Sequence, residues 1–160
     1  MKIVKQCIAA TFIILAASLL VVALPQSPVL AKSPVAELNL SSAGLALRGY
    51  DPVAYFKSGK PKIGKKAITA IHGGGTYRFS SEANREAFLA EPAKYLPQYG
   101  GFCAYGTAAN YKVDGDPNVW KIVDNKLYLN INKSVGRSWE SRQDHYIRKA
   151  DKVWPKIRSK

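Results

Sequence analysis

Short runs of β-branched and aromatic residues, separated by turn-forming residues, recur through the middle of this 160-residue chain. Such runs favour β-strands, and glycine between two of them favours a reversal because it adopts positive φ without steric cost. The pattern predicts two β-hairpins. The first joins residues 67–71 and 76–79 through His72-Gly-Gly-Gly75, and the second joins residues 119–123 and 127–131 through Asp124-Asn-Lys126. A further run, Val53-Ala-Tyr-Phe56, predicts a short strand.

Three other stretches have the pattern of helices. Ser80-Ser81 can cap a helix over residues 82–91, and Pro92 stops it. Residues 98–109 are rich in small side chains, which predicts a buried helix with Cys103 inside it. The last helix is predicted over residues 134–154, with one apolar stripe. That stripe consists of Val135, Trp139, Tyr146, Ala150 and Val153.

These elements together predict an α+β fold, a small antiparallel sheet of hairpins packed by helices, with a long C-terminal helix. The domain is expected over residues 49–160. Residues 32–48 have no sustained period and are expected to be a tether. A mature chain of this length forms one modest domain.

The N-terminus has the form of a secretory signal peptide. Lys2 and Lys5 precede an apolar run from Cys7 to Leu24, and Val29 and Ala31 occupy the positions that signal peptidase prefers. We expect cleavage after Ala31, which makes residues 1–31 the signal peptide. The alternative is an uncleaved membrane anchor, because the run just reaches spanning length. Both interpretations place the folded part outside the cytoplasm, in a periplasm, the medium or another lumen.

The chain is strongly basic, with 24 Lys and Arg against 11 Asp and Glu and a formal charge of +13. Cleavage removes Lys2 and Lys5 and no acidic residue, so the charge of the mature chain is +11. The positive residues lie mainly in the last helix and between Lys57 and Lys66. Because an exported protein does not meet nucleic acid, this charge indicates an acidic protein or an anionic membrane surface as partner. A solvated basic face is the alternative.

Candidate metal ligands are few. After cleavage the only thiol is Cys103, and the only imidazoles are His72 and His145. A thiolate with one or two imidazoles suits copper or zinc. The alternative is that Cys103 is a small buried residue, because free cysteine is among the most buried residue types. A Cys/His enzyme is a third alternative, although no motif around Cys103 supports it.

Several segments, in order, resemble the YHS domain. They are Gly49-Tyr-Asp-Pro-Val-Ala-Tyr-Phe56, Gly75-Thr-Tyr-Arg-Phe-Ser-Ser-Glu-Ala-Asn-Arg-Glu-Ala-Phe88, Glu91-Pro-Ala-Lys-Tyr95, Tyr99-Gly-Gly-Phe-Cys-Ala-Tyr-Gly106 and Lys126-Leu-Tyr-Leu-Asn130. The resemblance points to an exported branch of that family with an additional C-terminal helix. Its metal-associated members carry cysteines at positions that are Ala54, Ser80 and Asn84 in this chain. All three thiols are absent here.

The resemblance therefore implies a small binding module rather than an enzyme. One hypothesis is the handling of a soft metal ion, copper above all, by Cys103 with His72 and His145. The alternative is a metal-free module that docks an acidic protein or membrane through its basic surface. Within the matched motifs, Tyr50, Asp51, Tyr99 and Tyr105 are the candidate binding residues.

Overall fold

The computed structural model describes residues 37–160. The predicted signal peptide and the first part of the predicted tether lie outside these residues. Within residues 37–160, no helix is both long enough and apolar enough to span a bilayer.

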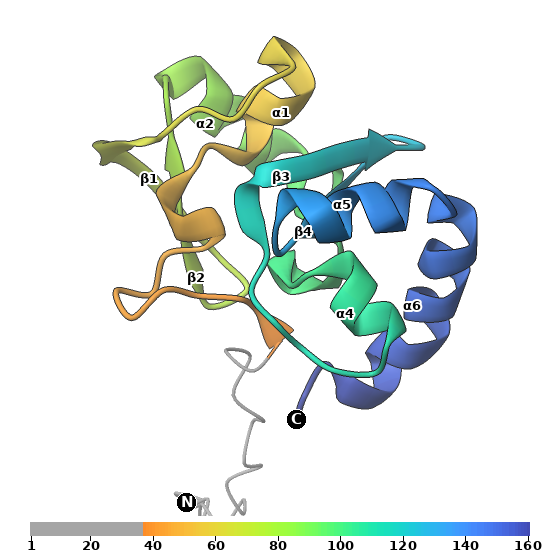
Figure 1. Cartoon of the computed structure of the whole chain (residues 1–160). Helices are drawn as coiled ribbons and strands as arrows, with labels where there is room; N and C mark the ends of the chain where they lie inside the picture. The colour runs from red at the N-terminus through yellow and green to blue at the C-terminus, as the bar shows by residue number, and fades with distance from the viewer. Residues whose placement is uncertain (1–36) are drawn as a thin grey trace, which may run out of the picture. The chain divides into compact units, whose positions relative to one another are not determined.

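The fold is α+β, as predicted from the sequence, and contains two antiparallel hairpins with helices packed on them (Figure 1). Each hairpin forms its own two-stranded sheet. The elements of the first half are η2 (Leu47–Gly49), α1 (Pro52–Ser58), β1 (Lys65–His72), β2 (Gly75–Phe79), α2 (Glu82–Ala90) and α3 (Pro92–Tyr95). Those of the second half are η3 (Gln98–Gly101), α4 (Ala104–Ala108), β3 (Asp116–Val123), β4 (Lys126–Asn130), α5 (Lys133–Glu140) and α6 (Gln143–Ile157).

Both predicted hairpins are present. Gly73 and Gly74 reverse the first with φ of 57° and 85°, and Asp124 and Asn125 reverse the second with φ of 48° and 57°. Two consecutive residues at positive φ match the twist of the strands they join, which is why glycine, asparagine and aspartate occupy these positions. The two-residue turns thus set the register of each sheet.

The prediction of a strand at Val53–Phe56 is wrong, because this segment lies in α1. The Asp51 carboxylate caps the helix by accepting from the amides of Val53 and Ala54, and Pro52 occupies the first turn. Gly59, at φ 61°, ends it. An aspartate cap, a proline and a final glycine are strong helix signals, and they outweigh the strand propensity of four residues.

The predicted helix over residues 98–109 is divided. Tyr99 and Gly100 adopt φ of 53° and 61° in η3, so the chain turns before α4 begins. Cys103 consequently caps the N-terminus of α4 instead of lying within a helix. Left-handed backbone at two successive residues cannot continue a right-handed helix.

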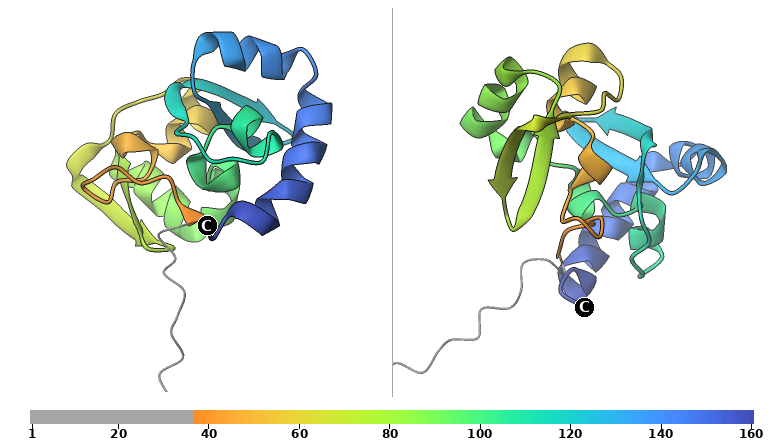
Figure 2. Two further views of the ribbon diagram at one scale, coloured as in Figure 1. Left: turned by 60° about the horizontal axis from the view of Figure 1, so that its bottom comes forward. Right: turned by 90° about the vertical axis from the view of Figure 1, so that its left-hand side faces the viewer.

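The last predicted helix is also divided, into α5 and α6, because Arg142 adopts φ −146° and ψ 44°. Trp139 and Ala150 of the predicted stripe are fully buried, and Tyr146 packs against the same cluster. The break changes the direction of the chain, and α6 then packs against α4 (Figure 1). Figure 2 shows the same arrangement from two further sides.

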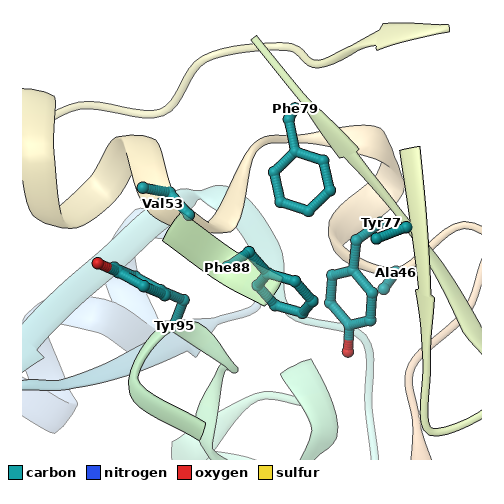
Figure 3. Packing of buried hydrophobic residues seen from close by; sticks show 7 residues of the cluster. Ala46, Val53, Tyr77, Phe79, Phe88 and Tyr95 are labelled. Carbon is teal, nitrogen blue, oxygen red and sulfur yellow. The ribbon is translucent and has the colours of Figure 1, made fainter. Parts of the chain in front are cut away.

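One core cluster lies between the first hairpin, α1, α2 and α3. The ring of Phe88 packs against those of Tyr77 and Phe79, at centroid distances of 5.0 and 5.2 Å (Figure 3). A second cluster fixes α4, α5 and α6 on β4, with Trp139 against Tyr128 at 5.4 Å.

Residues 38–48, the end of the predicted tether, pack against the domain. Ala46 is 3% exposed and Leu47 4% exposed, and Leu45 forms a bridge with Thr76. The amide of Asn39 donates to the carbonyl of Gly100 at 2.9 Å. A side chain at Gly100 would collide with the carbonyl of Glu37, so glycine is required for this close approach.

Candidate functional site

Cys103 lies in the interior, 1% exposed, between α4 and β4. Its thiol donates to the Asn130 side-chain oxygen at 3.5 Å and accepts from the amide of Gly106 at 3.5 Å. Both neighbours belong to the protein, and neither is a histidine. The thiol therefore has a structural role at the start of α4, whatever else it does.

The two histidines lie elsewhere on the fold. His72 ends β1, and its ring contacts that of Phe88 at a centroid distance of 5.8 Å. His145 is exposed on α6 and contacts the ring of Tyr146 at 5.3 Å. Among residues 37–160, no group of three or more His, Cys, Asp or Glu side chains could hold a metal ion. The copper or zinc hypothesis stays a prediction without a preformed ligand cluster in this part of the chain.

Asp51 is fully buried and is the most highly coordinated side chain of the described residues. One carboxylate oxygen accepts from the amides of Val53 and Ala54 at 2.9 and 3.3 Å. The other accepts from the amide and hydroxyl of Ser80 at 2.8 and 2.7 Å, and from the side-chain amide of Asn84 at 2.7 Å. These five hydrogen bonds join the start of α1 to the junction between β2 and α2.

The same network contains the positions at which the YHS resemblance expects thiols. Ser80 and Asn84 touch each other at 3.3 Å and both bind Asp51, and the backbone of Ala54 binds the same carboxylate. Ala54 lies far from Ser80 and Asn84 in sequence, yet all three positions converge on one buried carboxylate. In this chain hydrogen bonds to Asp51 therefore join α1 to the junction between β2 and α2.

The other candidate binding residues are dispersed. Tyr50 accepts from the side-chain amide of Asn118 at 3.3 Å on the surface. Tyr99, 5% exposed, donates to Asp151 of α6 at 2.9 Å. Tyr105 stacks on Tyr146 at 4.8 Å. These three and Asp51, the four candidates, do not form one site.

Tyr105 and Tyr146 belong to a polar and aromatic cluster on the surface. The Arg142 guanidinium donates to the Tyr146 hydroxyl at 3.1 Å, and this hydrogen bond lowers the pKa of the Tyr146 phenol. The hydrogen bond with Tyr146 in turn raises the pKa of Tyr105. A cation beside a phenol stabilises its charged form, which explains the direction at Tyr146.

Further along α6, three cations and one imidazole border a surface pocket of about 230 Å³. We call this set the basic face: His145, Arg148, Lys149 and Lys152. All four are exposed. No acidic residue among residues 37–160 forms an ion pair with Arg148, Lys149 or Lys152. The sequence located this charge on the last helix, and the spacing of 145, 148, 149 and 152 places it on one side.

Another cavity lies elsewhere on the fold. Its volume is about 310 Å³, and Tyr99 is the only candidate binding residue in its wall. Tyr77, Asp151 and Trp154 also line it, and sequence reasoning did not single them out as functional. They belong to β2 and α6, which lie far apart in the chain, so no local spacing could have indicated them.

Comparison of the chain with protein-family models, curated proteins and solved structures finds no match. The YHS resemblance accordingly stays a prediction from the quoted motifs.

Proposed function

We propose that this protein is an exported YHS-like binding module that docks an acidic surface of a partner protein through its basic face. The observation that carries the proposal is the exposed group of Arg148, Lys149 and Lys152 around a pocket, without an acidic partner among the described residues. Cations arranged around a concavity favour a carboxylate-bearing segment over a diffuse cloud of counterions.

A protein partner is favoured over a lipid surface because the apolar side of α6 is packed against the core. Ala150 is fully buried, and Ile147 and Trp154 pack against the same core cluster. A helix that binds at a membrane surface inserts an apolar stripe into the lipid. In α6 that stripe already packs against the core, which leaves a purely electrostatic contact.

Docking is also favoured over metal handling by the state of Cys103. A soft metal ion needs an accessible thiolate, and this thiol is 1% exposed and bound to Asn130 and Gly106. The basic face needs no rearrangement to meet a partner.

The test measures binding of a fluorescent oligo-glutamate peptide to the exported protein as salt is raised from about 0.05 M to about 0.5 M. The triple variant Arg148→Gln/Lys149→Gln/Lys152→Gln is compared with Lys57→Gln/Lys60→Gln/Lys62→Gln. The second variant removes the same charge from another exposed segment. We expect roughly a tenfold loss of affinity in the first variant and little change in the second.

Two outcomes would contradict the proposal. Equal losses in both variants would mean that net charge alone binds the peptide. Binding to vesicles that contain phosphatidylglycerol, without binding to the peptide, would assign the basic face to a membrane.

Export has its own test. N-terminal sequencing of the protein recovered outside the cytoplasm is expected to begin at Lys32, because the signal is predicted to be cut after Ala31. An intact Met1 on a membrane-bound protein would support the anchor instead.

A further inference from the structure

The cavity of about 310 Å³ differs from the rest of this basic protein in its lining. Its volume corresponds to about ten waters, enough for a small organic molecule. Among residues 37–160, no lysine or arginine lines it, and two carboxylates do. Its lining includes Glu37, Tyr77, Tyr99, Asp151 and Trp154.

Tyr77 lines this cavity, and its buried hydroxyl has no hydrogen-bond partner among residues 37–160. Figure 3 shows that it points away from the rings of Phe79 and Phe88, so it is not part of their apolar contact. The phenol is protonated at neutral pH and able to donate, and burial raises its pKa further, to about 12. A buried hydroxyl without a partner is costly, and its persistence indicates a group that completes it.

Asp151 provides the charge. One of its oxygens accepts from the Tyr99 hydroxyl at 2.9 Å, and no cation of residues 37–160 forms an ion pair with it. This is notable because Arg148 and Lys152 lie on the same helix. The second carboxylate, that of Glu37, pairs with Arg158 at 3.5 Å. Asp151 is therefore the unpaired negative charge of the cavity.

Aromatic rings form another part of the wall. The rings of Tyr99 and Trp154 meet edge to face, with centroids 5.9 Å apart and planes at 63°. Aromatic faces attract organic cations, Trp most strongly. Tyr99 holds its ring there in left-handed backbone at φ 53°, a conformation that costs energy for a residue other than glycine.

We propose that this cavity binds a small organic ammonium ion that also carries a hydroxyl or carbonyl group. The ammonium lies between the Asp151 carboxylate and the ring of Trp154, and the polar group of the ligand pairs with the Tyr77 hydroxyl. The proposal is independent of docking, because the cavity and the basic face share no lining residue.

The test uses choline as the probe and the exported protein, labelled with ¹⁵N. The chain has three tryptophans, Trp120, Trp139 and Trp154, and only the last lines the cavity. Their indole N–H resonances are therefore one reporter and two internal references. We expect choline to shift the Trp154 resonance saturably and to leave the other two in place. The uncharged carbon analogue, 3,3-dimethylbutan-1-ol, is expected to shift it much less.

Two variants assign the contacts. Asp151→Asn keeps a hydrogen-bond acceptor for Tyr99 but removes the charge, and we expect a loss of choline affinity of about tenfold. Asp144→Asn, an exposed acid on the same helix outside the cavity, is the control and should change nothing. Tyr77→Phe removes the hydroxyl and should lower the affinity for choline by about threefold.

The proposal is overturned if choline produces no saturable shift at Trp154, or if choline and its carbon analogue act equally. It is also overturned if Asp151→Asn and Asp144→Asn have the same affinity for choline. Each of these results leaves binding of the oligo-glutamate peptide, and thus the docking proposal, untouched.

Discussion

Two buried polar groups of this domain show opposite states. Asp51 accepts five hydrogen bonds that join α1 to the junction of β2 and α2. Tyr77 of β2 is as deeply buried, and its hydroxyl has no partner among the described residues. The Asp51 carboxylate uses its hydrogen-bonding capacity within the protein, whereas the Tyr77 hydroxyl is still able to donate and accept a hydrogen bond.

The difference separates a structural role from a binding role. A buried carboxylate is tolerated only where donors surround it, so Asp51 is expected to hold the fold together and to contact no ligand. A buried hydroxyl without a partner lowers stability, and a ligand that supplies the partner recovers that loss. The following predictions test this division.

The largest effect is expected at Asp51. Replacing it with alanine removes the acceptor of the Val53 amide and of the amide and hydroxyl of Ser80. The Ala54 amide keeps the main-chain carbonyl of residue 51. We expect the free energy of unfolding, measured in urea, to fall by roughly 3 kcal/mol or more.

The control is Asp114→Asn, which breaks an exposed ion pair with Arg48 of 3.3 Å. Its cost is expected to be below about 0.5 kcal/mol. If Asp51→Ala were as mild as this control, the hydrogen bonds around Asp51 would not hold the three elements together.

The next effect concerns alkaline pH. Burial raises the pKa of Tyr77 from 10.0 to about 12. Below pH 10 the phenol is protonated in the folded and the unfolded protein, so its ionisation does not change the free energy of unfolding there. Above pH 10 the unfolded chain loses this proton while the folded protein keeps it, so stability falls until the pH passes the folded pKa.

We expect urea unfolding at several pH values from 10 to 12 to show a steeper loss in the wild type than in Tyr77→Phe. The two slopes should differ by about 1.4 kcal/mol per pH unit at most. Parallel slopes would mean that Tyr77 ionises equally in both states and is not buried as described. Tyr55 and Tyr99, whose pKa values burial also raises, continue to contribute in both proteins.

The turns and caps were legible in the sequence because each depends on a few adjacent residues. The hairpins are indicated by Gly73-Gly74 and Asp124-Asn125, and α2 lies between its cap Ser81 and Pro92. The strand predicted at Val53–Phe56 failed since residue propensity was given more weight than the cap at Asp51. Propensity is the weaker signal over four residues.

The candidate site was less accessible to such reasoning. Tyr99 adopts left-handed backbone although it is neither glycine nor asparagine, so its residue type does not signal that conformation. Tyr77 and Asp151 meet the same cavity from β2 and α6. Distance in sequence hides such a site, because only tertiary packing brings its members together.

At neutral pH, Tyr77→Phe is expected to stabilise the ligand-free protein by about 1 kcal/mol, since it removes a buried hydroxyl that has no partner. Thermal unfolding measures the change. Tyr128→Phe serves as the comparison, because Tyr128 is also buried and its hydroxyl is not among the buried atoms without a partner. A loss of stability in Tyr77→Phe would show that its hydroxyl is already paired, and the contrast with Asp51 would disappear.

The smallest effect is expected at Cys103, a third buried polar group, whose thiol is paired within the protein. Cys103→Ser keeps a capping side chain at the start of α4 and should change the free energy of unfolding by less than about 1 kcal/mol. The thiol, like the Asp51 carboxylate, has its hydrogen-bond partners within the protein, so we expect it to bind no ligand. Wild type and Cys103→Ser should therefore bind Cu(I) equally in competition with a chromophoric chelator. Stoichiometric Cu(I) binding that the substitution abolishes would show that Cys103 binds a ligand, as proposed for Tyr77, and would support the copper hypothesis.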